Sequence, residues 1–408
     1  MKRVVVTGMA GISPIGSDWN TVSDNLKNLR TGIRRMDEWD IYAGLNTRLA
    51  GVVTDFEKPP HYNRKMTRSM GRVALMATRS AELALEDAGL LNDETIKDGR
   101  MGVAYGSSTG TPDAIKDFGN MLLNHSTEGL TANTYIKMMS HTTPVNIGVF
   151  FGLKGRIHTT SSACTSGSQA IGYAYEAIQS GKQLLMVAGG AEELCPTEAA
   201  VFDTLFATSL LNDAPETTPK PFDQHRDGLV ISEGAGTLIL EELEYAKARG
   251  ARIYAELVGF GTNSDGAHVT QPKTETMQVA MEKALEDANI QPKDIGYISA
   301  HGTATDRGDV AESQATFRVF GNKTPISSFK SFTGHTLGAC GALEAWVSIQ
   351  MMREGWCHAT ANLKEIDPAC GDLDYIMGQA RDLDTDYVMT NNFAFGGINT
   401  SLIFKKLS

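Results

Sequence analysis

The sequence predicts an α/β fold that is built twice, with one copy of a strand-and-helix plan in residues 1–250 and a second in residues 251–408. The first indication is a near repeat, because the segment Ala81–Leu90, AELALEDAGL, recurs as MEKALEDANI at Met281–Ile290. The second is length, since 408 residues are more than twice the size of a typical domain. The third is that strands and helices alternate in the same order around both segments, a pattern typical of sheets rich in parallel strands.

Each copy begins with a β-rich run that breaks at a glycine, Arg3–Gly8 in the first and Ile253–Gly259 in the second. The repeated amphipathic helix follows. We expect it to end at Gly89 or Asn289, because both residues tolerate the left-handed conformation that closes many helices. A short buried strand comes next in each copy, over Gly102–Gly106 and Ile295–Ala300.

A turn rich in serine and threonine then enters a helix of small residues, and an apolar strand after glycines closes each copy. Small side chains let a helix pack closely on its neighbours, so we expect these two helices to lie between two packed sheets. The helices are predicted over 170–178 and 342–351, and the closing strands over 236–240 and 399–404.

The composition argues against several classes of protein. Lys plus Arg number 37 and Asp plus Glu number 48, so the net charge of −11 disfavours a nucleic-acid partner. No apolar run approaches the roughly 18–20 residues that a membrane span needs. The run Val4–Val6 is also too short for a signal peptide. We therefore expect a soluble, cytoplasmic protein with no membrane partner.

Metal and nucleotide sites are not predicted either. The five cysteines include no C-x-x-C pair, which argues against a structural zinc site and a disulfide framework. The segment Thr7–Ile12 holds glycines, but not at G-x-G-x-x-G spacing, and no G-x-x-x-x-G-K-S/T loop occurs. We expect no metal, nucleotide or nicotinamide cofactor.

The chemistry is expected beyond the carboxyl ends of the strands, where loops of both halves can meet. Cys164 stands at the start of the first small-residue helix. There the helix dipole favours a thiolate, and free backbone N–H groups can bind an oxyanion. His301 and His335 adjoin glycines near strand ends of the second copy, so one thiol and two imidazoles form a nucleophile-and-base set. We expect the other cysteines to be packed thiols and leave two histidines undecided: Cys195, Cys340, Cys357 and Cys370, and His141 and His268.

Motifs of a known family occur along essentially the whole chain. They are Ala163–Gly167, Pro221–Asp223 with Arg226–Gly228, Glu233–Gly236, His301–Thr305 with Gly308–Asp309, Lys330–His335 and Phe393–Asn399. These motifs resemble those of the β-ketoacyl-acyl-carrier-protein synthases, in particular the type II (elongating) condensing enzymes. The resemblance implies the thiolase-like fold, in which duplicated α/β layers (αβαβα) contain two mixed sheets with helices between and outside them. Within this family a Cys-His-His set favours the elongating group.

The resemblance also implies a reaction. Cys164 would take an acyl group from a thioester, and the acyl-enzyme would condense with malonyl-acyl-carrier-protein, releasing carbon dioxide, to give 3-oxoacyl-acyl-carrier-protein. The substrates would be carried on the 4'-phosphopantetheine arm of the acyl carrier protein, with no other cofactor. His301 and His335 would hold the malonyl carbonyl oxygen, and the backbone N–H groups of Cys164 and Phe395 would form the oxyanion hole. Phe395 would gate access to Cys164, and Lys330 would orient His335.

Further residues receive roles from the same resemblance. The residues that would bind substrate are Thr303, Thr305, Phe393, Thr109 and Thr270. Those that would support the site structurally are Asp309, Glu312 and Glu344. A basic cluster, with three members one helical turn apart, would dock the acidic carrier protein: Arg64, Lys65, Arg68 and Arg72. We expect a homodimer, or a pair with a related ketosynthase-like subunit.

Several residues depart from the family pattern and leave alternatives open. Thr109 stands where a bulky apolar residue often lines the acyl pocket, Ala394 and Ile398 replace Gly and Thr, and Asp306 replaces Pro. These changes favour, as an alternative to fatty acid synthesis, a ketosynthase of a specialised aryl-polyene or polyketide pathway. A non-catalytic chain-length partner subunit is disfavoured because it would lack Cys164. A cysteine hydrolase is disfavoured because no third residue is evident that would orient a general-base histidine.

Overall fold

The strands of the two halves meet in one mixed sheet of eleven strands. The computed structural model describes residues 1–407. The order across the sheet is β13-β11-β10-β15-β16-β9-β1-β8-β6-β4-β5. In chain order the bounds are β1 Val4–Ile12, β4 Met101–Gly106, β5 Ile157–Thr159, β6 Leu185–Glu192, β8 Gly234–Glu242, β9 Ala255–Ser264, β10 Tyr297–Ser299, β11 Pro325–Ser327, β13 Asp374–Tyr375, β15 Tyr387–Ala394 and β16 Ile398–Lys405.

The duplication expected from the sequence is confirmed by the strand order. In the N-terminal half, β1 and β8 pair antiparallel, β8 and β6 pair antiparallel, and β6, β4 and β5 run parallel. The C-terminal half repeats this order with β9, β16, β15, β10 and β11, and adds β13 at its edge. Each half therefore combines two antiparallel strands with a parallel set.

A short pairing between β1 and β9 joins the two halves, and the sequence did not predict it. Val4, Val5 and Val6 pair antiparallel with Leu257, Glu256 and Ala255. All three valines are fully buried, so the pairing satisfies backbone groups that would otherwise lie unpaired in the interior. The two expected sheets are therefore linked through their first strands.

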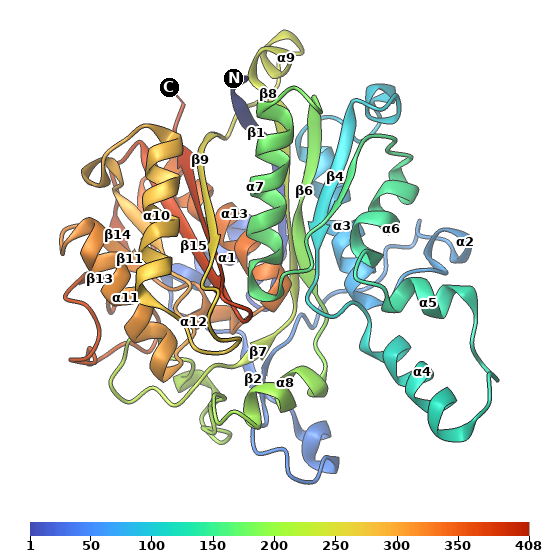
Figure 1. Ribbon diagram of the computed structural model, residues 1–408, viewed down its shortest axis with the longest axis horizontal. Helices are drawn as coiled ribbons and strands as arrows, with labels where there is room; N and C mark the ends of the chain where they lie inside the picture. The colour runs from blue at the N-terminus through green and yellow to red at the C-terminus, as the bar shows by residue number, and fades with distance from the viewer. Residues whose placement is uncertain (408) are drawn as a thin grey trace.

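Helices cover both outer faces and fill the space between the halves, which gives the five layers of the thiolase-like fold. In Figure 1, α10 and α11 lie on one side of the molecule, α3 and α6 on the other, and α7 and α13 between them. The bounds are α3 Arg72–Asp87, α6 Thr142–Phe151, α7 Ser166–Gln179, α10 Thr274–Ala288, α11 Asp306–Phe320 and α13 Cys340–Glu354. The largest apolar cluster contains residues of both halves, so the halves share one core.

The repeated helices α3 and α10 end as expected. The chain turns left-handed at Gly89, with φ 68°, and at Asn289, with φ 53°. A residue in this conformation lets the last carbonyls of a helix find backbone donors.

Glycines allow the first turns of α7 and α13 to cross at the centre of the molecule. A Cβ atom on Gly167 would lie 2.9 Å from the carbonyl oxygen of Gly338, and one on Gly341 would lie 2.7 Å from the backbone nitrogen of Ser168. Each helix follows a short 3-10 turn, η3 (Ala163–Thr165) before α7 and η6 (Leu337–Ala339) before α13. The two turns and helices are therefore equivalent parts of the duplicated fold.

The remaining elements surround this frame. The other helices are α1 Trp19–Lys27, α2 Arg64–Thr67, α4 Pro112–Asn124, α5 Ala132–Met138, α8 Pro196–Asp203, α9 Leu243–Ala248 and α12 Lys330–Thr333. The remaining 3-10 turns are η1 Asp37–Ile41, η2 Glu94–Lys97, η4 Pro215–Thr217 and η5 Pro292–Asp294. Small sheets are formed by β2 Ile33–Arg35, β3 Leu49–Gly51 and β7 Ile231–Ser232, and by β12 Trp356–Cys357 and β14 Arg381–Asp382. Across residues 1–407, no helix has the length and apolar character needed to cross a membrane.

Candidate active site

Cys164 lies in the turn η3, directly before α7, where the sequence places it. Side chains of the turn fix its shape, because the Ser166 hydroxyl donates to the carbonyl of Ala163 at 2.7 Å and Thr165 Oγ1 donates to the carbonyl of Ser162 at 2.8 Å. Ala163 has φ 52°, a conformation that side chains other than glycine adopt at a cost. The turn thus presents the Cys164 sulfur at the N-terminus of a buried helix.

Both predicted histidines face this sulfur from the C-terminal half. His301 follows β10, and His335 follows α12 beyond the end of β11. His335 Nε2 lies 3.0 Å from Cys164 Sγ, and the centroids of the two imidazole rings are 5.2 Å apart. Nitrogen atoms of both rings and the sulfur lie within 4.8 Å of one another. This donor set could also hold a metal ion; the absence of a metal stays a prediction.

The two imidazoles are neutral at physiological pH. Burial lowers the pKa of His301 and of His335 well below the usual value, and the positive charge of Lys330 lowers both further. Each Nδ1 atom is buried with no hydrogen-bond partner among residues 1–407. A bare lone pair at that position costs less than an unpaired N–H donor. The arrangement therefore favours the tautomer that carries its proton on Nε2, toward the cavity.

The expected stabilisation of a Cys164 thiolate is outweighed in the folded chain. Burial raises the pKa of Cys164 to about 11, although Lys330 and the backbone N–H groups of Phe395 and Cys164 act in the opposite direction. The helix dipole favours the thiolate, but removal of the thiolate from water costs more free energy than these groups return. In the resting protein Cys164 is therefore a thiol, and it lies beside the neutral imidazole of His335.

Lys330 and Glu344 form a buried ion pair near Cys164 and His335. Lys330 Nζ lies 2.5 Å from Glu344 Oε1, and Glu344 Oε2 accepts from Asn392 Nδ2 at 2.6 Å. Burial raises the pKa of Glu344, and the charge of Lys330 counteracts this. No hydrogen bond joins Lys330 to His335 within the described chain, so Lys330 influences the imidazoles through its charge.

Two acidic side chains fix the loop that carries His301. Glu312 accepts from the backbone N–H groups of His301 and Gly302, both at 2.7 Å. Asp309 accepts from those of Thr303 and Ala304, both at 3.1 Å. The loop is held through its backbone, which leaves the His301 ring free to face the cavity.

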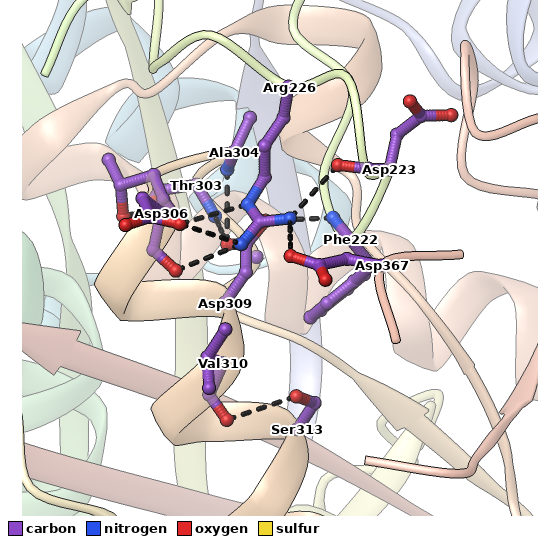
Figure 2. Close-up of polar contacts among 12 residues, drawn as sticks. Phe222, Asp223, Arg226, Thr303, Ala304, Asp306, Asp309, Val310, Ser313 and Asp367 are labelled. Atoms are coloured by element: carbon purple, nitrogen blue, oxygen red, sulfur yellow. Dashed lines mark hydrogen bonds and ion pairs between the residues drawn. The ribbon is translucent and has the colours of Figure 1, made fainter. Parts of the chain in front are cut away.

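Arg226 and Asp367 complete this support, and sequence reasoning gave neither a role. Figure 2 shows the Arg226 guanidinium among the loop carbonyls and three carboxylates. It donates to Asp367 at 2.6 Å and to the carbonyl of Asp306 at 2.9 Å, and it lies 3.6 Å from Asp309. Burial raises the pKa of Asp309 to about 6, even though Arg226 opposes the rise. Arg226 belongs to the family motif Arg226–Gly228, but only the fold shows that its side chain reaches the His301 loop.

A cavity of about 610 Å³ opens onto Cys164 and both histidines. Four of the five residues expected to bind substrate line it, Thr303, Thr305, Thr270 and Phe393, and so does the predicted gate residue Phe395. It also contains residues without an assigned role, among them His268, which was left undecided, and the exposed Arg307. Thr109 does not line this cavity; its hydroxyl donates instead to Glu198 Oε1 at 2.9 Å.

The loop after β15 places Phe395 at the cavity. Its ring packs on Phe202 with 5.1 Å between centroids. Gly396 and Gly397 follow with φ 89° and 70°, and the Gly396 N–H donates to the carbonyl of Val269 at 2.8 Å. Phe393 lies 6.1 Å from the ring of His301. Two glycines beside Phe395 give this loop the freedom that a gate requires.

The predicted basic cluster does not lie on one continuous helix. Arg64 and Lys65 are exposed in the short helix α2, and Arg68 is exposed just after it. Arg72 begins α3 and pairs with Glu233 at 2.8 Å. The chain breaks between these helices, and Arg72 is half-buried and held by its ion pair with Glu233, whereas Arg64, Lys65 and Arg68 are exposed.

The chain was compared with known proteins. Residues 1–246 match the family "Beta-ketoacyl synthase, N-terminal domain", and residues 254–364 match "Beta-ketoacyl synthase, C-terminal domain". A 3-oxoacyl-[acyl-carrier-protein] synthase 2 of Vibrio harveyi is 39% identical over 423 aligned positions, which cover 100% of this chain and 99% of the relative.

Solved structures agree with this result. A beta-ketoacyl synthase from Burkholderia phymatum is 61% identical, with a TM-score of 0.99 and 100% of both chains covered. A type II PKS acyl-carrier protein in complex with its ketosynthase bound to the hexaketide gives a match at 30% identity and TM-score 0.88, again over 100% of both chains.

Proposed function

This chain belongs to the beta-ketoacyl synthase family, and we propose that it catalyses the decarboxylative condensation of an acyl thioester with malonyl-acyl-carrier-protein. The product is a 3-oxoacyl-acyl-carrier-protein two carbons longer, as in the elongation of fatty acids. One observation carries the proposal: Cys164 Sγ lies 3.0 Å from His335 Nε2, and His301 lies at the same cavity. An acyltransferase of this class needs a nucleophile and two hydrogen-bond donors at one point.

The first step is acyl transfer to Cys164. The sulfur attacks the thioester carbonyl, the C–S bond to the carrier breaks, and the carrier leaves as a thiol after taking up the proton of Cys164. The backbone N–H groups of Cys164 and Phe395 lie close enough to the sulfur to lower its pKa, which supports their assignment as the oxyanion hole for the tetrahedral intermediate. Phe395 swings away from Phe202 to admit the substrate, and the two glycines beside it support this motion.

The second step forms the carbon–carbon bond. The malonyl carboxylate leaves as carbon dioxide, and its bonding electrons pass to the thioester as an enolate. The enolate oxygen accepts hydrogen bonds from Nε2 of His301 and His335, whose neutral state supports this role. The enolate carbon then attacks the acyl group on Cys164 and expels the sulfur as a thiolate, which takes up a proton from solvent to restore the resting thiol. The electrons come from the malonyl carbon–carbon bond, so the reaction needs no cofactor besides the carrier's phosphopantetheine.

The cavity also fits the carrier's pantetheine arm. Thr303 and Thr305, whose hydroxyls lie 2.9 Å apart, offer hydrogen bonds to its amides, and Thr270 and Phe393 line the same cavity. Arg307 adds an exposed positive charge at this cavity for its phosphate. We assign docking of the acidic carrier to Arg64, Lys65 and Arg68, which remain exposed. The support roles of Asp309, Glu312 and Glu344 follow from their hydrogen bonds and belong to the same proposal.

We further propose that two chains associate at the edge strand β5. This strand has a neighbour on one side only, and Ile157 on it is 48% exposed. Val149 on the adjoining helix α6 is 77% exposed. An unpaired edge beside apolar side chains is suited to association with a second copy or a related ketosynthase-like subunit. Light scattering on the purified chain distinguishes a homodimer from a monomer that needs another subunit.

A second candidate function is the same condensation in a specialised aryl-polyene or polyketide pathway. Thr109 favours it, because its polar contact with Glu198 differs from the apolar lining of a pocket for saturated chains. The non-catalytic partner and the hydrolase remain disfavoured by Cys164 and the paired histidines. The division into halves at residues 250 and 251, and a cytoplasmic location, stay predictions that limited proteolysis and cell fractionation can check.

Replacement of the nucleophile tests the proposal directly. Cys164→Ala should abolish formation of 3-oxoacyl product from acyl- and malonyl-carrier-protein, measured by mass spectrometry of the carrier. Cys164→Gln should lose condensation and retain or gain malonyl decarboxylation, since the histidines are untouched. The matched control is Cys370→Ala, which removes a thiol outside the cavity. Condensation by Cys164→Ala at the wild-type rate would refute the proposal.

A further inference from the structure

The exposed basic residues that we assign to carrier docking stand on a segment with little packing of its own. Arg64 and Lys65 lie in α2, a helix of four residues that buries none of them, and Arg68 follows directly. Figure 1 shows α2 at the edge of the molecule, beyond α3 and α6. A helix this short is not stable by itself in water. The position of the three cations therefore depends on what holds the two ends of the segment.

Before α2, the chain is anchored to Glu82 on α3. His61 Nε2 lies 2.7 Å from Glu82 Oε1, and the Tyr62 hydroxyl donates to Glu82 Oε2 at 3.0 Å. Arg79, one turn earlier on α3, donates to the same Oε2. Tyr62 is 1% exposed, and its ring packs on Phe150 of α6 with 4.5 Å between the ring centroids. The chain is therefore fixed on α3 and α6 two residues before α2 begins.

Glu82 is an ionised carboxylate that these three side chains share. Burial raises the pKa of Glu82, but the hydrogen bonds from His61, Arg79 and Tyr62 outweigh burial and hold the pKa below its usual value. A hydrogen bond to a carboxylate is stronger than one between neutral groups, and a buried carboxylate without its donors is costly. Glu82 therefore holds the residues before α2 against α3 more firmly than an uncharged acceptor would.

A second anchor follows α2. The Ser69 hydroxyl donates to Asn146 Oδ1 at 2.7 Å, and Asn146 Nδ2 donates back to the carbonyl of Ser69 at 3.3 Å. Asn146 is 3% exposed on α6, where its Nδ2 also donates to the carbonyl of Thr142 at 2.7 Å. Because its own helix fixes this amide, the amide holds Ser69 in one position. The exposed segment 64–68 is therefore attached at both ends, to α3 before it and to α6 after it.

We propose that Glu82 and Asn146 are positioning residues for the docking of the acyl carrier protein, because they fix the exposed segment that meets it. The inference rests on the docking role proposed above for Arg64, Lys65 and Arg68. An exposed ion pair contributes little when the backbone and side chains that carry it must first be ordered. Attachment at both ends removes the backbone part of that cost before the carrier arrives. The gain matters for this chain, since its net charge of −11 repels an acidic carrier elsewhere on the surface.

Transfer of one acyl group from two donors tests this role. The donors are an acyl-acyl-carrier-protein and the pantetheine thioester of the same acid, which lacks the carrier; the acid is the one of four, eight or twelve carbons that the wild-type protein transfers fastest. Intact-mass spectrometry gives the rate at which each donor acylates Cys164, and the ratio of the two kcat/KM values measures the contribution of docking. Glu82→Gln should lower this ratio by about three- to tenfold, the change expected when weak surface ion pairs lose their geometry. Ser69→Ala, which removes the hydroxyl that Asn146 holds, should lower it by a smaller factor.

Two further variants show whether the anchors act through the cations. The triple variant Arg64→Ala/Lys65→Ala/Arg68→Ala should also lower the ratio. Addition of Glu82→Gln to it should cause no further fall, because the anchor then positions no charge. The matched control is Glu86→Gln, the same change about one turn farther along α3 at an exposed side chain, which should leave the ratio at its wild-type value. Thermal unfolding of every variant reports whether the fold is intact.

The outcomes separate this inference from the proposals on which it rests. A wild-type ratio in the triple variant would overturn both the docking role of the cations and the inference, and would leave the condensation standing. If the triple variant lowers the ratio but Glu82→Gln does not, or if Glu82→Gln lowers it further in the triple variant, only the inference is overturned. Should Glu82→Gln fail to fold, Ser69→Ala decides in its place. A protein that accepts acyl groups from neither donor would refute the condensation as well.

Discussion

The turn that carries Cys164 and the turn that carries Gly338 are the same piece of structure used in two ways. Both are 3-10 turns that lead into a central helix, and both begin with a left-handed residue, Ala163 with φ 52° and Leu337 with φ 44°. At the equivalent position one presents a sulfur to two imidazoles, and the other donates its backbone N–H to Glu192. The backbone thus provides two equivalent turns, and the side chains around each turn decide whether it carries a reactive group.

The side chains that surround Cys164 differ chemically from those that surround Gly338. His301 and His335 follow strands of the C-terminal half and approach Cys164. Glu192, the last residue of β6 in the N-terminal half, accepts from the backbone N–H of Gly338 and from that of Ser108, which follows β4. Neutral imidazoles can donate to a developing oxyanion. The duplicated fold therefore places two imidazoles beside Cys164 and a carboxyl group beside Gly338.

We expect the largest effect from removal of either imidazole. His301→Ala and His335→Ala should each lower malonyl decarboxylation by about 10²–10⁴-fold, the usual contribution of a positioned donor. His335→Ala should also slow acylation of Cys164, because it removes the group 3.0 Å from Sγ. His301→Ala should leave acylation near the wild-type rate. Separate assays of carbon dioxide release and acyl-enzyme formation check this, and equal losses in both assays would contradict the division of roles.

The reactivity of Cys164 should depend strongly on pH. Because burial raises the pKa of Cys164 to about 11, the thiolate fraction should rise about tenfold per pH unit and reach about 10³-fold between pH 7 and 10. The rate of iodoacetamide labelling of Cys164, measured by mass spectrometry, should follow this rise. A plateau below pH 8 would show that the thiolate is already formed in the resting protein.

The ion pair behind the nucleophile gives the next effect. Lys330→Met leaves Glu344 buried without its cation and should destabilise the fold by about 3–5 kcal/mol. The double variant Lys330→Met/Glu344→Leu removes both charges and should recover much of this loss. Denaturant unfolding of the two variants provides the measurement. A double variant as unstable as the single one would indicate that packing, not charge, holds this region.

The smallest predicted effect is the change in stability when the side chain at Cys164 or Gly338 changes size. Gly338→Ala places a Cβ atom 2.9 Å from Ser107 Cα and 3.0 Å from Glu192 Oε2, so it should cost about 1–3 kcal/mol. Cys164→Ala only shortens a side chain and should cost less. Thermal unfolding of both variants tests the order. If Cys164→Ala were the less stable of the two variants, the turn at Gly338 would not be more tightly packed than the turn at Cys164.

The sequence was sufficient to predict the duplicated fold, because the repeat around Ala81 and Met281 and the order of elements are local features. The sequence also predicted that Cys164, His301 and His335 lie together, because their motifs stand where strands end and helices begin. Their roles remain predictions until the variants are measured. The pKa of Cys164 could not be predicted, because burial depends on side chains from both halves that are distant in sequence.

Other features failed for similar reasons. The pairing of Arg72 with Glu233 depends on the break between α2 and α3, and helical spacing alone does not show it. The β1–β9 pairing joins segments about 250 residues apart through only three residue pairs.

The place of α13 in the middle of the molecule has a consequence for how the chain is made. This helix covers the inner side of β8, β6 and β1, yet it ends only at Glu354. At about 5–20 residues per second, a ribosome needs on the order of ten seconds after β6 before that helix emerges. During this interval the nascent N-terminal half exposes an apolar surface, so its release or cleavage at that stage would yield an aggregating fragment and not a separate domain.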